Sequence, residues 1–229
     1  RIVDPRSAVD AVLNDSNNDF TGTRFSDKIN GAGGNDSLYG DAGNDRLDGG
    51  SGNDSLVGGE GNDSLFGGLG NDRLQNDAGH EMLDGGDGID TVVFTGSAAV
   101  TVNLRLTAKQ ATGYGTDIFR NIENVVAGSG NDSLSGNSSA NNLQSGAGND
   151  TLLGGGGNDL LYGGGGADRL NGGVGRDVLF GGGNDGVTDV FVFTAIADST
   201  VGNTRDVIND FVAGTDDIDL AGIDANTAL

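Results

Sequence analysis

A strict nine-residue period is the feature that most constrains how this chain can fold. From residue 31 the sequence reads GAGGNDSLY, GDAGNDRLD, GGSGNDSLV, GGEGNDSLF and GGLGNDRLQ, followed by a degenerate unit, NDAGHEMLD, and by GGDGIDTVV. The unit GTRFSDKIN, which starts at residue 22, has the same phase with most of its glycines lost. A second array begins at residue 127 with AGSGNDSLS, ends with GGVGRDVLF and is out of phase with the first. The period therefore predicts two repeat arrays with an insertion between them.

The eighth position of the unit decides between a flexible linker and a folded array. It is apolar in every unit of both arrays: Ile29, Leu38, Leu47, Leu56, Leu65, Leu74, Leu83 and Val92 in the first, and Leu134, Leu143, Leu152, Leu161, Leu170 and Leu179 in the second. A glycine-rich spacer has no reason to keep an apolar residue in phase. We therefore expect a folded array whose core consists of these side chains.

Each unit has an extended half and a turning half. Residues such as 37–39 predict a short strand whose central side chain points inward, and glycine permits the sharp turn that the other half must make. One unit cannot bury its single apolar side chain, so the units must stack. One nonapeptide per half-turn would give an 18-residue coil with the apolar side chains inside.

The net charge excludes several classes of partner. Among 229 residues, 34 are Asp or Glu and 12 are Lys or Arg, which gives a net charge of −22. So acidic a chain repels phosphate backbones, and a nucleic-acid partner is not expected. No apolar run is long enough to cross a bilayer, and the lack of Cys excludes disulfides and thiolate metal sites.

The sixth position of the unit supplies most of the repeated carboxylates. An Asp at this position lies beside the carbonyl groups of the glycine turn, and such hard oxygen ligands suit Ca²⁺ better than zinc or copper. In an 18-residue coil, units two apart stack on the same edge. This stacking predicts four ladders: Asp27, Asp45 and Asp63; Asp36, Asp54, Asp72 and Asp90; Asp132, Asp150 and Asp168; and Asp159 and Asp177. Asp54 then has an Asp neighbour on both sides, whereas Asp90 has only one.

The pattern GGxGxDxUx, where U is a large apolar residue, resembles the RTX (repeats-in-toxin) calcium-binding family over residues 22–94 and 127–186. The resemblance implies an all-β fold, a parallel β-roll or β-solenoid, with Ca²⁺ between neighbouring Asp residues and about eight ions in total. Each ion would be held by two carboxylates and by carbonyl oxygens of the flanking turns. For one slot these ligands would be Gly50, Gly52 and Asp54 with Gly67, Leu69 and Asp72.

The turn residues that the resemblance implies as ligands recur through both arrays. In the first array they are Gly31, Gly33, Gly34, Gly43, Gly49, Gly50, Gly52, Gly58, Gly59, Gly61, Gly67, Gly68, Leu69, Gly70 and Gly85. In the second they are Gly130, Gly146, Gly148, Gly154, Gly155, Gly157, Gly163, Gly164, Gly166, Gly172, Gly173 and Gly175. About eight Ca²⁺ ions would bring the net charge to about −6, so we interpret the acidic excess mostly as a set of ligands.

Some units depart from the pattern. Glu81 and Asn141 replace the Asp at position six, and Asn76 and Ser145 replace the leading glycine. We expect these edges to bind Ca²⁺ weakly or not at all. The Asn at position five is expected to bond the turn instead of the ion, because Ile, Ala and Arg replace it in other units. The residues concerned are Asn35, Asn44, Asn53, Asn62 and Asn71.

The arrays and their flanks predict five segments. They are an N-terminal flank over 1–21, a first β-roll over 22–94, a β insertion over 95–126, a second β-roll over 127–188 and a C-terminal cap over 189–229. The apolar run 189–193 is expected to close the open end of the roll. The DxIxDFxxGxDxIDL pattern that follows is similar to the region after the roll in serralysin-type metalloproteases and other type I secreted proteins. That resemblance implies export by the type I secretion machinery, with a signal expected to be truncated at Leu229.

The sequence offers no set of residues for catalysis. Its single His, His80, is not followed by the second His of an HExxH motif, and the sequence has no GxSxG motif with which it could form a catalytic triad. The GxGxxG match at 181–186 lacks a strand–helix context. We expect a non-catalytic, calcium-binding domain of a secreted protein that folds on Ca²⁺ binding outside the cell. The alternatives are the accessory C-terminal part of a secreted protease, lipase or polysaccharide-modifying enzyme, and an adhesin or surface-layer scaffold.

Overall fold

The structure is a computed structural model, and it describes residues 7–183, 185–195, 198–199 and 205–223. Parts of the predicted flank (1–6) and of the predicted cap (196–197, 200–204 and 224–229) therefore lie outside the described residues. The chain forms two compact units, one of residues 1–95 and 106–124 and the other of residues 96–105 and 125–229. The predicted insertion is thus divided between the two units. The described part contains no helix that is long and apolar enough to span a membrane.

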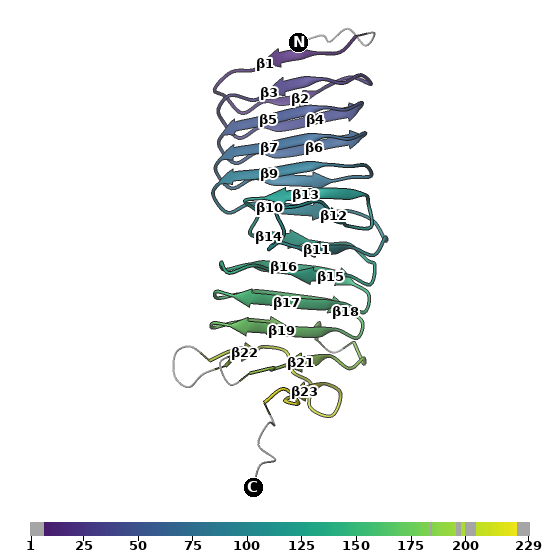
Figure 1. Ribbon diagram of the computed structural model, residues 1–229, viewed down its shortest axis with the longest axis vertical. Coiled ribbons are helices and arrows are strands. Elements are labelled where there is room, and N and C mark those ends of the chain that lie inside the picture. The colour runs from purple at the N-terminus through teal and green to yellow at the C-terminus, as the bar shows by residue number, and fades with distance from the viewer. Residues whose placement is uncertain (1–6, 184, 196–197, 200–204, 224–229) are drawn as a thin grey trace. The chain divides into compact units, whose positions relative to one another are not determined.

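The first unit consists of two sheets of short strands (Figure 1). Its strands are β1 (Asp10–Val12), β2 (Asp19–Thr21), β3 (Lys28–Asn30), β4 (Ser37–Ala42), β5 (Arg46–Ser51), β6 (Ser55–Glu60), β7 (Ser64–Leu69), β8 (Arg73–Asn76), β9 (Met82–Asp87), β10 (Thr91–Phe94), β12 (Gln110–Ala111) and β13 (Thr116–Arg120). One sheet has the order β1-β3-β5-β7-β9-β13-β12, and β2, β4, β6, β8 and β10 are successive neighbours in the other. The β12–β13 pair is antiparallel, and the remaining described pairs of this unit are parallel.

The second unit repeats this arrangement. Its strands are β11 (Thr101–Asn103), β15 (Ser133–Ser135), β16 (Asn142–Ala147), β17 (Thr151–Gly156), β18 (Leu160–Gly165), β19 (Arg169–Val174), β20 (Val178–Phe180), β21 (Val190–Val192), β22 (Val207–Ile208) and β23 (Asp217–Asp219). One sheet has the order β11-β15-β17-β19-β21-β23, and β16, β18, β20 and β22 are successive neighbours in the other. These pairs are all parallel. Along the chain, β14 (Asn124–Val126) begins at the last residue of the first unit.

The strand register confirms the predicted 18-residue coil. Leu38 pairs with Leu56 in one sheet, and Leu47 pairs with Leu65 in the other. Consecutive nonapeptides therefore alternate between the two sheets, and each coil places its strands beside those of the coil before it. The predicted all-β parallel β-solenoid is confirmed.

The core consists of the position-eight side chains, as the period predicts. These residues are all between 0% and 2% exposed: Ile29, Leu38, Leu47, Leu56, Leu65, Leu74, Leu83, Val92, Leu134, Leu143, Leu152, Leu161, Leu170 and Leu179. Burial of one such side chain stabilises the fold by about 1.5–3 kcal/mol.

The coil extends beyond the recognised nonapeptides at both ends of the chain. Strands β1 and β2 lie in the stretch assigned to the flank, and they pair in parallel with β3 and β4. In the stretch assigned to the cap, β21 pairs in parallel with both β19 and β23, and β22 pairs with β20. The apolar run 189–193 thus continues the ladder of coils, and β23 forms the last described rung of its sheet.

Candidate metal centre

The repeated Asp residues are joined from coil to coil by hydrogen bonds. The backbone N–H of Asp36 donates to Oδ1 of Asp54, and the N–H of Asp54 donates to Oδ1 of Asp72, both at 2.7 Å. The same bond, at 2.7–2.9 Å, joins Asp27 to Asp45, Asp45 to Asp63, Asp72 to Asp90, Asp132 to Asp150, Asp150 to Asp168 and Asp159 to Asp177. The predicted stacking of these residues at 18-residue spacing is confirmed.

The second carboxylate oxygen of these residues has no protein partner. Oδ2 is buried and accepts no hydrogen bond in Asp36, Asp45, Asp54, Asp63, Asp72, Asp90, Asp132, Asp150, Asp159, Asp168 and Asp177. Asp54, for example, is only 3% exposed. A buried carboxylate oxygen that is neither hydrated nor paired is costly. A bound cation or a proton would remove this cost at each of these oxygens.

Glycine at position one lets the carboxylate and a carbonyl oxygen of the next coil lie close to the turn without a clash. At Gly49, a Cβ atom would lie 2.3 Å from Oδ2 of Asp54 and 2.7 Å from the carbonyl oxygen of Gly67 in the next coil. The corresponding distance to Oδ2 is 2.1–2.4 Å at Gly31, Gly58, Gly67, Gly85, Gly154, Gly163 and Gly172. A carboxylate oxygen and backbone carbonyl oxygens thus line the same space, and this donor set fits Ca²⁺.

Glycines at positions two and four bring the turns of neighbouring coils close together. Gly50 and Gly52 have φ angles of 101° and 131°. A Cβ atom on them would lie 2.3 Å from the carbonyl oxygen of Ala32 and 1.9 Å from that of Gly34. The other predicted turn glycines with positive φ are Gly34, Gly43, Gly59, Gly61, Gly68, Gly70, Gly146, Gly148, Gly155, Gly157, Gly164, Gly166, Gly173 and Gly175. Of the remaining predicted ligands, Gly33 forms a bridge with Ser51, Gly130 packs against Ala98, and the side chain of Leu69 is exposed.

Burial raises the pKa values of several of the repeated carboxylates. Desolvation is the largest cause, and it raises the pKa of Asp45 and Asp72 to about 6 and that of Asp159 and Asp168 to about 7. Neighbouring carboxylates add to the rise, whereas the backbone N–H of the preceding coil opposes it. Near neutral pH, metal-free carboxylates of this kind are in part protonated, and a bound cation would favour their charged form.

Asp27 differs from the other predicted ligands because protein groups satisfy both of its oxygens. Oδ2 accepts hydrogen bonds from the backbone N–H of Thr23 at 2.5 Å and from its hydroxyl at 3.1 Å. Oδ1 accepts the N–H of Val9. Asp117, which comes from the insertion, is satisfied in a similar way: Oδ1 accepts the N–H of Glu81 at 2.9 Å, and Oδ2 accepts the hydroxyl of Thr112.

The degenerate units fill the space that glycine leaves open elsewhere. The Ser145 hydroxyl donates to the carbonyl oxygen of Gly163 at 2.8 Å. The Asn76 side-chain amide donates to Oδ2 of Asp117 at 3.2 Å. Asn141 replaces the carboxylate with an amide whose oxygen accepts the N–H of Asn137. These contacts support the expectation that the edges at residues 76 and 145 bind Ca²⁺ weakly or not at all.

Position-five Asn side chains bond the turns, as predicted. The side-chain oxygen of Asn35 accepts the N–H of Asn53, and that of Asn53 accepts the N–H of Asn71, both at 2.8 Å. The same ladder runs from Asn44 to Asn62 and from Asn62 to His80. A second ladder of side chains therefore joins the coils next to the carboxylates.

Sequence reasoning missed several carboxylates that continue the ladders, among them Glu123, Asp189 and Asp206. Oε2 of Glu123 accepts the N–H of Asp90 at 2.9 Å, so Asp90 has a carboxylate neighbour on both sides and not on one side only. Asp189 and Asp206 accept the N–H groups of Asp168 and Asp177 at 3.0 and 2.9 Å, and Oδ2 of both is buried without a partner. The nine-residue period could not reveal them, because none stands 18 residues after its partner.

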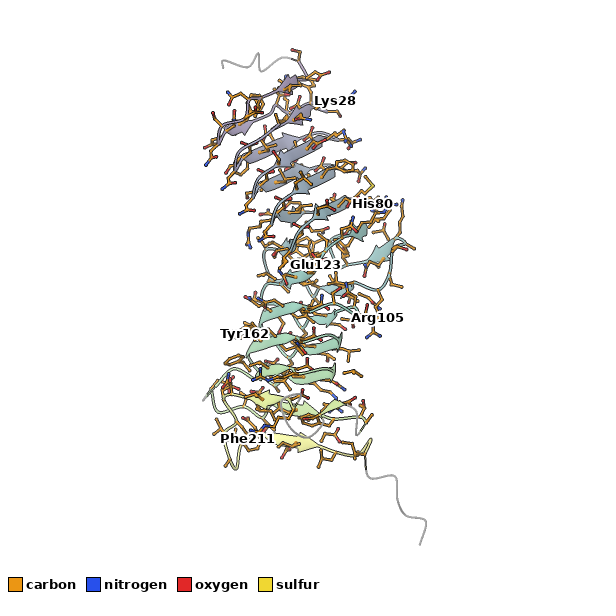
Figure 2. All side chains as sticks on the ribbon, turned by 90° about the vertical axis from the view of Figure 1, so that its left-hand side faces the viewer. Lys28, His80, Arg105, Glu123, Tyr162 and Phe211 are labelled. Atoms are coloured by element: carbon orange, nitrogen blue, oxygen red, sulfur yellow. The ribbon has the colours of Figure 1, made fainter. Side chains whose placement is uncertain are left out.

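The described residues do not form a metal site from side chains alone. No group of three or more His, Cys, Asp or Glu side chains within that part of the chain could hold a metal ion, so carbonyl oxygens must complete any site. His80 is exposed on the outside of the first unit, as predicted (Figure 2). Its Nδ1 accepts the N–H of Thr116 at 3.1 Å.

Comparison with known families identifies both parts of the chain. The model of the RTX calcium-binding nonapeptide repeat matches four overlapping copies at residues 14–47, 21–56, 39–74 and 57–92. The model of the peptidase M10 serralysin C terminal matches residues 117–229, which include the second array and the tail. The search of curated proteins found no match. Both predicted family resemblances are confirmed.

Proposed function

We propose that this chain, with its RTX calcium-binding repeats and its serralysin-type C-terminal region, is a calcium-dependent folding module of a protein secreted by the type I route. The observation that carries the proposal is the row of buried Oδ2 atoms that face glycine turns without a hydrogen-bond donor. A divalent cation at each position would satisfy a carboxylate and neighbouring carbonyl oxygens at once. Calcium prefers oxygen ligands of this kind.

Folding and calcium binding would then be coupled. Without the ion, stacked carboxylates such as Asp54 and Asp72 repel each other and must lose their hydration. With the ion, each slot cross-links two adjacent coils and adds binding free energy to folding. Extracellular calcium modules bind in the range of about 10⁻⁴ to 10⁻³ M, so the chain would stay expanded in a low-calcium cytosol. That behaviour suits export as an unfolded chain followed by folding outside the cell.

The geometry refines which slots we expect to be strong. Asp45, Asp54 and Asp72 would hold ions toward the next coil, because their free Oδ2 atoms face that side. The slot after Asp27 would be weak, because Thr23 already satisfies Oδ2 of Asp27. Glu123, Asp189 and Asp206 would complete further slots beside Asp90, Asp168 and Asp177.

Circular dichroism with added Ca²⁺ or Mg²⁺ at equal ionic strength tests this proposal. We expect Ca²⁺ to induce a cooperative change to a β spectrum and to protect the chain from proteolysis. We expect Mg²⁺ to have little effect, because it binds with near-ideal octahedral geometry and retains its waters. A β spectrum and protease resistance that are the same with EDTA, Mg²⁺ and Ca²⁺ would overturn the proposal.

The match to the serralysin C terminal favours one context for this module. Both matched families describe non-catalytic regions, and the match supports an accessory role beside the catalytic domain of a secreted enzyme. Deletion of this chain from such an enzyme should abolish export and leave the chemistry of the separately produced catalytic domain intact. Normal export of the deleted form would contradict that role.

A further inference from the structure

The coil that contains Glu81 is followed, in the first unit, by a coil from the insertion. Strand β9 pairs in parallel with β13 (Figure 1), and Met82 lies opposite Ile118. Glu81 stands where the regular units have Asp, and its N–H donates to Oδ1 of Asp117 at 2.9 Å. Glu81 and Asp117 therefore follow each other as two successive carboxylates of a regular ladder do.

The side chains of these two residues also meet. The carboxyl group of Glu81 shares a hydrogen bond with that of Asp117, and the two residues are 3% and 0% exposed. Ionised carboxylates can only accept hydrogen bonds, so a hydrogen bond between two carboxyl groups needs a proton. Repulsion and the loss of hydration also oppose two charges in a buried pair. The contact between Glu81 and Asp117 therefore requires one proton.

The donors around the pair decide which residue holds the proton. Asp117 accepts three hydrogen bonds: Oδ1 accepts the N–H of Glu81, and Oδ2 accepts the side-chain amide of Asn76 and the hydroxyl of Thr112. Neither oxygen of Glu81 accepts a bond from an N–H or O–H group of another residue. Donors of this kind stabilise the charged form of a carboxyl group. Asp117 is therefore the ionised partner, and Glu81 is the protonated one.

We propose that Glu81 is protonated at neutral pH and donates its proton to Asp117, so that a proton joins the insertion to the first roll without a metal ion. Regular coils differ, because their free Oδ2 atoms lie beside a glycine turn. Position one of this unit is Asn76, whose buried amide bonds Asp117 instead. The pair responds to pH in its own direction: alkaline pH removes its proton, whereas acid weakens the calcium sites that we propose for the regular coils.

The charged groups around Glu81 favour its protonated form. Burial, followed by the hydrogen bond and the charge of Asp117, raises the pKa of Glu81 from 4.5 to about 9. Asp63 in the coil before and Asp77 in the same coil also raise this pKa. His80, next to Glu81 in the chain, is exposed, and its ring accepts a backbone N–H of the insertion. Folding therefore takes up one proton between about pH 5 and pH 9, and the stability that the pair supplies is lost as the pH rises over this range.

Unfolding of the full chain by urea in saturating Ca²⁺ at pH 6, 7 and 8 tests this pair. The amide of Glu81→Gln has the shape of a protonated Glu and donates at every pH. We expect the unfolding constant of the wild type, divided by that of Glu81→Gln, to rise about tenfold per pH unit. The pH dependence of the calcium sites cancels in this ratio. The same ratio for Glu60→Gln, an exposed Glu in the coil before, should stay constant, and a constant ratio for Glu81→Gln would overturn the proposal.

Infrared spectroscopy detects the proton itself and does not depend on how the variants unfold. We expect the wild type to show a protonated-carboxyl band at pH 7.5 in saturating Ca²⁺, and this band to fade as the pH rises through about 9. Glu81→Gln should lose the band, and Glu60→Gln should keep it. A wild type without the band at pH 7.5, or an equal band in Glu81→Gln, would overturn the proposal.

Discussion

Asp27 and Asp45 stand one coil apart on the same ladder and are equally buried, at 1% and 2% exposure, yet their carboxylates have different partners. Thr23 donates its backbone N–H and its hydroxyl to Asp27, whereas Oδ2 of Asp45 has no donor. Burial of a carboxylate therefore does not by itself create a need for calcium. The need arises where the turn contains glycine instead of a residue that can donate a hydrogen bond.

The same contrast recurs elsewhere in the chain. Asp198 accepts the N–H groups of Thr194 and Ala195 and the Thr194 hydroxyl at 2.6–2.8 Å, and the Thr112 hydroxyl donates to Asp117. We call Asp27, Asp117 and Asp198 the threonine-bonded carboxylates. Each lies outside the regular GGxGxD units. On the proposed function the regular units would depend on the ion, while protein donors satisfy these positions.

Removal of one regular carboxylate should have the largest effect. Asp54→Asn takes a ligand from the slots on both sides of the residue, which would leave buried charge uncompensated at a cost of about 3–5 kcal/mol. Asp27→Asn is the matched control and should cost about 1 kcal/mol, because only hydrogen bonds change. Unfolding by urea in saturating Ca²⁺ measures both. Equal losses of stability in the two variants would contradict the comparison.

Closing the space in front of a carboxylate should have the next largest effect. Gly49→Ala places a methyl group 2.3 Å from Oδ2 of Asp54, and such overpacking costs about 1–3 kcal/mol. It should also lower the number of bound ions. Gly165→Ala is the control, because a Cβ there meets nothing within 4 Å, and its stability should change by less than about 1 kcal/mol. If both variants melt at the wild-type temperature and bind the wild-type number of ions, the glycine argument is wrong.

Removal of the Thr23 hydroxyl should make Asp27 more like the carboxylates of the regular units, which have fewer hydrogen-bond donors. Thr23→Val leaves Asp27 with backbone donors only, which should destabilise the folded chain by about 1 kcal/mol. The same variant should gain more stability from a rise in Ca²⁺ concentration than the wild type does. Thermal unfolding at two Ca²⁺ concentrations that both fold the chain measures that gain. A smaller gain than in the wild type would count against the role of the hydroxyl.

A change of pH should have the smallest effect on the stability of the calcium-saturated chain. A lower pH should weaken calcium binding, whereas it should favour the folded form of the calcium-free chain. The folded pKa of Asp45 and Asp72 is raised from 3.8 to about 6, so their contribution to calcium-free stability is present below about pH 4 and is lost as the pH rises through 6. Protons also compete with Ca²⁺ as the pH falls toward 6. The rise in melting temperature between two Ca²⁺ concentrations that both fold the chain should therefore be smaller at pH 5 than at pH 7.5. A larger rise at pH 5 would contradict the assignment.

The nine-residue phase was sufficient to predict the core and the ladders. Leu38 and Leu56 meet in the sheet, and Asp36 bonds Asp54, because every unit of the array has the same length. It could not predict Glu123, because the insertion returns to the ladder after 33 residues. Strands β1 and β2 were missed because the glycines are lost there, although Asn18 still donates its N–H to Asp36.

The role of Asp27 was hidden for a different reason. Its unit matches the repeat at position six, but the hydroxyl that satisfies it belongs to position two, where the pattern expects glycine. Glu81 shows a second case, in which a departure from the pattern brings its carboxyl group into contact with that of Asp117. Pairings of this kind depend on where a side chain points, and a repeat pattern does not specify that.

The central claim is that the folding of the regular units requires calcium. Small-angle X-ray scattering of the full chain in EDTA and in saturating Ca²⁺ tests it most directly. The account predicts an expanded chain with a large radius of gyration in EDTA, near that of an unfolded chain, and a single cooperative compaction as Ca²⁺ is added. A chain that is equally compact in EDTA and in Ca²⁺ at pH 7.5 would contradict it.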